Sequence, residues 1–240
     1  MPSADKPQGP AVAVAANVAT MSIAGAARRV AMVSAPLALI AFSFLHGSVS
    51  WAETQHLHSA SNEEWIQHLS NIKERWLAIH VAGVFLFPLL GLTVWWMLPP
   101  RGIASRISQA ALAVYMPLYI AVDAVLGIGS AILIRYRDGL APAERAGADG
   151  ALAAIFFEPS VIDWLDRGAS LTWRIGLVAA AIAVWRTSGW RVSLPLAVAG
   201  WALGTSHFPP LGEVAGLALL VAVWMHLRRR QDTAISAFTA

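Results

Sequence analysis

Long apolar runs, each close to the length that crosses a lipid bilayer, constrain this sequence more than any other feature. A membrane-spanning helix needs about 20 mostly apolar residues to cross a hydrocarbon core of about 30 Å. Such runs occupy residues 30–48, 76–98, 107–134 and 170–185, and a further run covers residues 192–227. In agreement, 57% of the residues are hydrophobic and only 13% are charged, whereas soluble domains are about 25% charged. We therefore expect an all-α, polytopic integral membrane protein.

The last apolar run is too long for one helix, and two prolines divide it. Pro209 and Pro210 follow Ser206, His207 and Phe208, and proline ends a preceding helix but fits the first turn of the next. The sequence thus predicts six helices, the fifth at residues 190–205 and the sixth at 210–227. Since the fifth would rise only about 24 Å, a re-entrant segment is the alternative to a full crossing.

The basic residues predict that both termini lie in the cytoplasm. With six helices, ten of the 17 lysines and arginines fall on the side of the termini, six fall on the other side, and Arg174 lies within the fourth helix. Short cytoplasmic loops carry an excess of basic residues. We expect a disordered or loosely helical tail at residues 1–29, a transmembrane domain at 30–227 and a tail at 228–240, in a plasma or inner membrane.

Two further features lie within the first predicted helix and in the segment after it. Residues 28–52 resemble a signal peptide that would be cleaved near Ser50-Trp51-Ala52, in which case the first helix is absent from the mature protein. Ser61 to Glu64 has the capping-box pattern of a helix start, and the apolar residues that follow recur at helical spacing. We interpret this second feature as an amphipathic helix at the membrane surface.

The composition of the chain excludes several kinds of covalent link and metal site, and it argues against one class of partner. The chain has no cysteine, so disulfides, thiolate metal sites and covalent haem attachment are excluded. The net charge of +3 does not indicate nucleic-acid binding, because the basic residues flank apolar runs. The lipid bilayer is the expected partner, together with a small or lipid-soluble substrate, and a homo-oligomer or a complex subunit is compatible with the sequence.

Four ionisable residues from distant parts of the chain share one predicted layer near the outer membrane surface. His46, His80, His207 and Glu213 each lie at the outer end of a predicted helix or in an outer turn. Imidazole and carboxylate ligands without thiolate suit copper, iron or zinc, and two facing histidines could hold a b-type haem. The alternative is that these groups only bond to water or to loop carbonyls. His56 and His58 form a weaker, local pair.

A second polar feature lies on the predicted third helix. Tyr115, Tyr119 and Asp123 recur every four residues and therefore share one face. Counting from Arg135 places Asp123 about 18 Å below the outer surface, where a carboxylate must be protonated, paired or hydrated. We expect Arg174 to pair with Asp123, either as a structural bridge or as part of a proton or ion site.

Three functional hypotheses follow. The first is a metal- or haem-binding membrane protein, such as an oxidoreductase, that uses the histidine layer. The second is a proton-coupled transporter or permeation protein that uses Asp123 and Arg174, and the third is a structural subunit of a membrane complex. The sequence contains no nucleophile motif that would indicate hydrolase chemistry. It does not determine whether the protein is an enzyme.

Overall fold

The computed structural model describes residues 10–46, 61–156 and 161–239, and every regular element within them is a helix. The long helices are α1 (Pro10–Leu45), α3 (Asn62–Met97), α4 (Ile103–Val122), α7 (Val161–Ser188), α8 (Trp190–Thr205) and α9 (Leu211–Thr239). Between α4 and α7 lie a π-helix, η1 (Asp123–Gly129), then α5 (Ser130–Gly139), a short 3-10 turn η2 (Pro142–Glu144) and α6 (Ala146–Phe156). The predicted all-α fold is confirmed.

Five helices in the described part of the chain are long and apolar enough to cross a membrane. They are Ile23–Leu45, Asn62–Met97, Ile103–Gly139, Ile162–Ser188 and Leu211–Asp232. The fifth predicted helix, α8, has the predicted bounds and only 16 residues. The protein is therefore an integral membrane helix bundle of about six helices, although the length of α8 alone does not establish a crossing.

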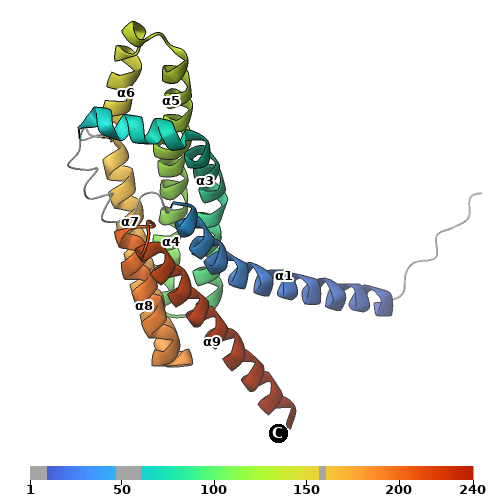
Figure 1. Cartoon of the computed structure of the whole chain (residues 1–240). Coiled ribbons are helices and arrows are strands. Elements are labelled where there is room, and N and C mark those ends of the chain that lie inside the picture. Colours follow the sequence, from blue (N-terminus) through green and yellow to red (C-terminus); the bar gives the residue numbers. More distant parts are fainter. Residues whose placement is uncertain (1–9, 47–60, 157–160, 240) are drawn as a thin grey trace, which may run out of the picture.

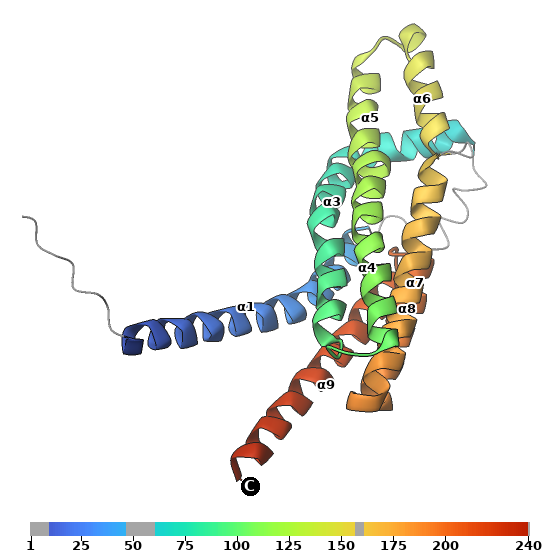
Figure 2. The same cartoon turned by 180° about the vertical axis from the view of Figure 1, so that it is seen from behind.

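The helices form a bundle in which neighbours along the chain pack against each other (Figures 1 and 2). α7 packs on α4 and α8, and α9 packs on α8 and α1. The first turns of α1 lean away from the bundle, whereas its last turns contact α3 and α9. Met32, Ala35, Leu39 and Phe42 of α1 are buried in the main core. The helix also begins at Pro10, well before the predicted start at residue 30.

A second, smaller unit caps one end of the bundle. The first part of α3 runs across the bundle end before the helix turns downward, and α5 and α6 rise beside it (Figure 1). We call residues 62–76 of α3 together with α5 and α6 the cap. Its own apolar core includes Trp65, Leu69, Ile134 and Leu152. The predicted capping box is present, since Ser61 Oγ accepts from Glu64 N–H and the Glu64 carboxylate accepts from Ser61 N–H.

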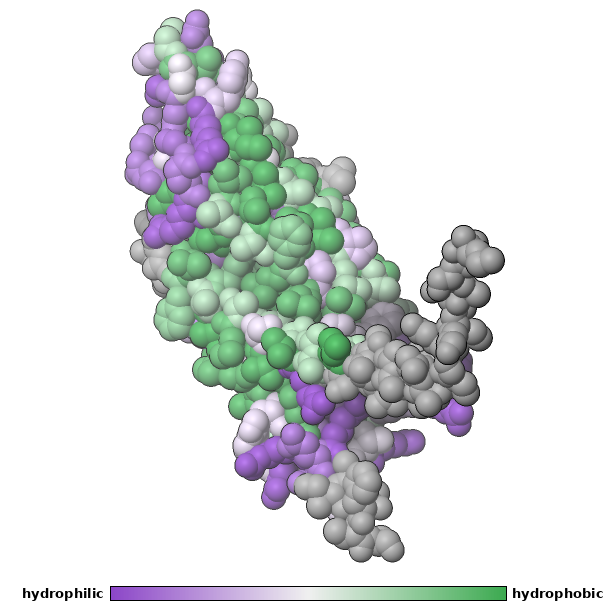
Figure 3. All heavy atoms as spheres, turned by 90° about the vertical axis from the view of Figure 1, so that its right-hand side faces the viewer, coloured by the Kyte–Doolittle hydropathy of each residue, from purple (hydrophilic) through white to green (hydrophobic). Residues whose placement is uncertain are grey.

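Charged side chains connect the elements of the cap. Lys73 Nζ lies 2.6 Å from Asp138 Oδ2, and Ser70 Oγ donates to the same oxygen at 2.7 Å. Arg137 pairs with Asp149 of α6. Figure 3 shows that one face of the molecule has a hydrophobic band between a hydrophilic cap and a hydrophilic opposite end. This distribution is typical of a membrane protein whose two ends contact water.

Candidate metal site

Three histidines from three separate elements meet where the bundle joins the cap. His46 directly follows α1, His80 lies in α3, and His207 lies in the turn between α8 and α9. One possible ligand atom from each lies within 4.8 Å of the other two. His46 and His80 are only 2% and 4% exposed. The structure therefore brings together three of the four residues that the sequence placed in one layer.

The backbone of Trp76 determines which nitrogen of His80 is available. His80 Nδ1 lies 2.8 Å from the carbonyl oxygen of Trp76, and because a carbonyl can only accept, Nδ1 carries the proton. In the neutral ring Nε2 is then an unprotonated acceptor or metal ligand. The Trp76 indole N–H in turn donates to the Leu126 carbonyl and to Ser130 Oγ at 3.3 and 3.2 Å. No pattern in the sequence indicated this role of Trp76.

His207 and His46 also direct an unpartnered nitrogen into buried space. His207 Nδ1 lies 2.9 Å from the hydroxyl of Tyr119, whereas its Nε2 is buried without a hydrogen-bond partner. His46 Nε2 is likewise buried and unpartnered. Leaving a buried polar atom without a partner costs about 1–3 kcal/mol. Nε2 of His46 and Nε2 of His207 are therefore both available to accept a hydrogen bond or to bind a metal ion.

The surroundings keep these imidazoles neutral. His46 and His207 lie just beyond the ends of the membrane-spanning segments. Burial is the main cause that lowers the pKa of His207 to about 3, and the nearby His80 adds to it. Burial holds the pKa of His46 well below its ordinary value. Electrostatic interactions with His207, His80 and Arg75, in that order, lower this pKa further. The neutral ring is the form that binds a metal ion.

Asp123 lies beside the histidines. Its Oδ1 is 4.0 Å from His80 Nε2, its side chain is almost fully buried, and its Oδ2 has no partner. Two glycines allow this close approach of α3 and η1. A Cβ on Gly83 would overlap the Asp123 carboxylate, and a Cβ on Gly127 would overlap the His80 ring. Each helix thus presents a glycine opposite the ionisable side chain of the other.

The helix that carries Asp123 is widened at this point into η1, a π-helix of seven residues. Such segments are rare and are found frequently at functional sites. Asp123 and Gly127 are both buried within it. The hydroxyl of Tyr119, in the turn before η1, lies 2.9 Å from His207 Nδ1, so one residue of the predicted tyrosine face contacts the histidine layer.

The structure does not show the expected pair of Asp123 and Arg174. Arg174 is not its partner, because Arg174 is exposed and donates to the Gly204 carbonyl at 2.6 Å and to Thr205 Oγ1 at 3.2 Å, both on α8. Asp123 instead packs against α3. The helix Ile103–Gly139 continues through α5 into the cap (Figure 1), and the expected depth of Asp123 stays a prediction.

The remaining candidates lie outside the three-histidine group. Glu213 is not among the residues whose ligand atoms gather there, although its Oε2 is buried without a partner. Tyr115 is buried, and its ring lies 5.5 Å from that of Tyr119, but its hydroxyl has no partner. His56, His58 and the Ser50-Trp51-Ala52 segment lie outside the described residues.

Comparisons with known proteins do not assign this site. No protein-family model, curated protein or solved structure matches the chain. The geometry of the site is therefore the basis for a functional proposal.

Proposed function

We propose that this integral membrane protein binds one transition-metal ion through His46, His80 and His207. A single observation supports the proposal: two buried imidazoles and one half-buried imidazole, from distant parts of the chain, direct ligand atoms to within 4.8 Å of one another. Buried polar atoms normally have partners. A metal ion would supply a partner for Nε2 of His46 and of His207, both of which lack one.

The spacing is compatible with coordination after a small closure. Zinc binds imidazole nitrogen at about 2.0–2.1 Å, which separates nitrogens in a tetrahedral site by about 3.4 Å. Movement of the side chains by about 1 Å would therefore close the present arrangement. Neutral imidazoles suit zinc, copper and iron.

Neighbouring groups orient the proposed ligands. Metal-bound histidines usually donate their second N–H to a carbonyl or to another polar group. Here the Trp76 carbonyl accepts from His80 Nδ1, and the Tyr119 hydroxyl is positioned to accept from His207 Nδ1. These contacts leave Nε2 of both rings for the metal.

The fourth coordination position gives the site its chemistry. Three protein ligands with an open position are typical of catalytic rather than structural sites. Asp123, 4.0 Å from His80 Nε2, can provide an oxygen ligand or accept a proton from a metal-bound water. With copper or iron the same arrangement would serve an oxidoreductase that acts on a small or lipid-soluble substrate.

The ring packing favours an ion over a haem. The ring centroids of Phe42, His80, His207 and Phe208 lie between 4.7 and 5.3 Å from that of His46. These pairs are arranged edge to face. A haem needs two histidines across a flat, open slot, whereas the described side chains here fill the space around His46.

Elemental analysis of the purified protein tests the proposal. After dialysis against zinc and removal of free metal, we expect about one ion per wild-type chain, and a loss of most of it in His46→Ala, His80→Ala and His207→Ala. The matched control is His226→Ala, because His226 is also buried and unpartnered but lies far along α9. Equal metal content in the wild type and in all three site variants would refute the proposal.

A further inference from the structure

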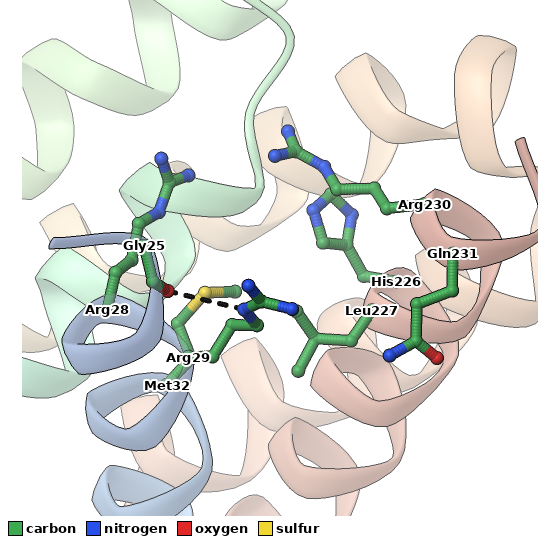
Figure 4. A pocket seen from close by; sticks show the side chains of 8 residues that line it. All are labelled: Gly25, Arg28, Arg29, Met32, His226, Leu227, Arg230 and Gln231. Atoms are coloured by element: carbon green, nitrogen blue, oxygen red, sulfur yellow. Dashed lines mark hydrogen bonds between the residues drawn. The ribbon is translucent and has the colours of Figure 1, made fainter. Parts of the chain in front are cut away.

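A basic pocket lies between α1 and α9, away from the histidine site. Its volume is about 380 Å³, and its lining includes Gly25, Arg28, Arg29, His226, Arg230 and Gln231. Figure 4 shows side chains of the two facing helices extending into the space between them. Arg29 and His46 are 17 positions apart on the chain, which corresponds to about 25 Å along a helix. The pocket is therefore a separate feature of the bundle.

The pocket has an excess of positive charge. Three arginines line it, and the lining residues that the structure describes include no aspartate or glutamate. None of the ion pairs found within the described residues involves Arg28, Arg29 or Arg230. Arg230 is also close enough to Arg28 and His226 to interact with both electrostatically. An anion in the pocket would relieve this repulsion.

Part of the pocket is held in place by other contacts. The Arg28 guanidinium donates to the Trp96 carbonyl and lies 5.7 Å from the centroid of the Trp96 ring. Arg29 Nε donates to the Gly25 carbonyl at 3.3 Å. These contacts use only some of the five N–H donors of each guanidinium. Donors therefore remain for a ligand with several oxygen acceptors.

His226 provides an independent indication of a ligand. It lines the pocket and is only 5% exposed, and both of its ring nitrogens are buried without a partner. A neutral imidazole carries one N–H donor. An anionic oxygen in the pocket would give this donor an acceptor, which no described protein group provides.

We propose that the pocket binds the phosphate headgroup of an anionic phospholipid. The lining residues belong to the first turns of the span Ile23–Leu45 and the last turns of the span Leu211–Asp232. Lipid headgroups occur at this level of a transmembrane helix. Met32 and Leu227 also line the pocket, so an apolar surface adjoins the arginines, as the start of an acyl chain requires.

The charge of the pocket favours anionic over zwitterionic lipid. Basic pockets between membrane helices bind acidic headgroups, and each basic residue near the surface adds to the attraction. A zwitterionic lipid would bring a cation into a pocket that already holds three arginines. Inorganic phosphate offers the same oxygen acceptors without an acyl chain, so the experiment must separate the two sources.

Native mass spectrometry of the detergent-solubilised full chain tests the proposal. We expect one phosphatidylglycerol molecule to stay bound under activation that removes phosphatidylcholine. Excess inorganic phosphate should not displace the lipid. The variant Arg29→Gln/Arg230→Gln should weaken phosphatidylglycerol binding about tenfold or more. Arg28 is left unchanged because it contacts Trp96.

The matched control is Arg101→Gln/Arg106→Gln, which removes two exposed arginines that do not line the pocket. This control should bind phosphatidylglycerol as the wild type does, and both variants should keep the wild-type helical circular dichroism. Equal lipid binding in the pocket variant and the control would overturn the proposal. Displacement of the lipid by phosphate, or equal retention of phosphatidylcholine, would also overturn it.

Discussion

At the scale of single residues, Tyr119 links the two polar features of the sequence. Its hydroxyl contacts His207 Nδ1 at 2.9 Å, and its ring lies against Phe87. Removing a group that orients a metal ligand typically lowers metal affinity by 10–100-fold. We therefore expect Tyr119→Phe to bind zinc at least tenfold more weakly than the wild type in a competition titration with a chromophoric chelator.

Tyr115 provides the control for this prediction. It lies one turn before Tyr119 and is equally buried, but its hydroxyl has no hydrogen-bond partner. Tyr115→Phe should therefore leave zinc affinity unchanged and should preserve or raise stability. Equal affinities of the two variants would show that the hydroxyl of Tyr119 does not orient His207.

Asp123 and Arg174 should act independently of each other. The structure places Asp123 against α3 and Arg174 on α8, so no direct interaction couples them. In a double-mutant cycle with Asp123→Asn and Arg174→Gln, the free energies of unfolding should add to within about 0.5 kcal/mol. Unfolding in mixed detergent micelles measures them. A coupling of about 3 kcal/mol, expected when one partner of a buried pair is removed, would contradict the observed geometry.

At the scale of elements, the close contact between α3 and η1 holds the site together. Gly127 allows the His80 ring to lie directly on the η1 backbone. We expect Gly127→Ala to displace that ring and to destabilise the protein by about 1–3 kcal/mol, as overpacking does. Zinc affinity should fall as well. Thermal unfolding and the chelator titration measure the two effects.

Gly150→Ala is a matched control for this substitution. Gly150 lies in α6, and a Cβ there would meet no atom within 4 Å. Alanine is favoured over glycine within a helix by about 0.5–1 kcal/mol, so this variant should be slightly more stable and should bind zinc normally. A Gly127→Ala variant that behaves in the same way would mean that His80 does not pack on η1.

The sequence predicted the helices well because apolar length and proline positions determine them. It also indicated that His46, His80 and His207 share a layer, since each lies at the same end of a predicted helix. It could not indicate η1, because no residue pattern distinguishes a π-helix from the α-helix that it interrupts. The partner of Asp123 was missed for a related reason: the rotation of each helix about its own axis, which decides whether Asp123 faces α3 or α7, depends on tertiary packing.

At the scale of the whole molecule, the two proposed sites use different ends of the same helices. His46 and His207 lie at the ends of α1 and α9 that meet the cap, whereas Arg29 and Arg230 lie towards the opposite ends of those helices. The cap covers the histidine end with its own apolar core and ion pairs. The arginine end is open and basic. This asymmetry gives the bundle a defined direction in a membrane.

The location of the C-terminus tests which end of the bundle faces the cytoplasm. It also tests whether the short helix α8 crosses the membrane. α9 ends on the same side of the bundle as the connection between α7 and α8 (Figure 1). This arrangement predicts that α8 returns the chain across the membrane, even though its 16 residues rise only about 24 Å. The basic residues at this end predict that it faces the cytoplasm. If α8 did not cross, α9 would start in the cytoplasm and end outside.

Because the chain has no cysteine, single cysteines report topology without interference. We expect a membrane-impermeant maleimide to label Gly147→Cys in the cap of intact cells, and to label Thr187→Cys and Gln231→Cys only after permeabilisation. Gly147 has no atom near its added Cβ, and Gln231 is exposed, so neither substitution should disturb the fold. Labelling of Gln231→Cys but not of Thr187→Cys in intact cells would show that α8 is re-entrant. Labelling of both, with Gly147→Cys protected, would reverse the orientation that the arginines predict.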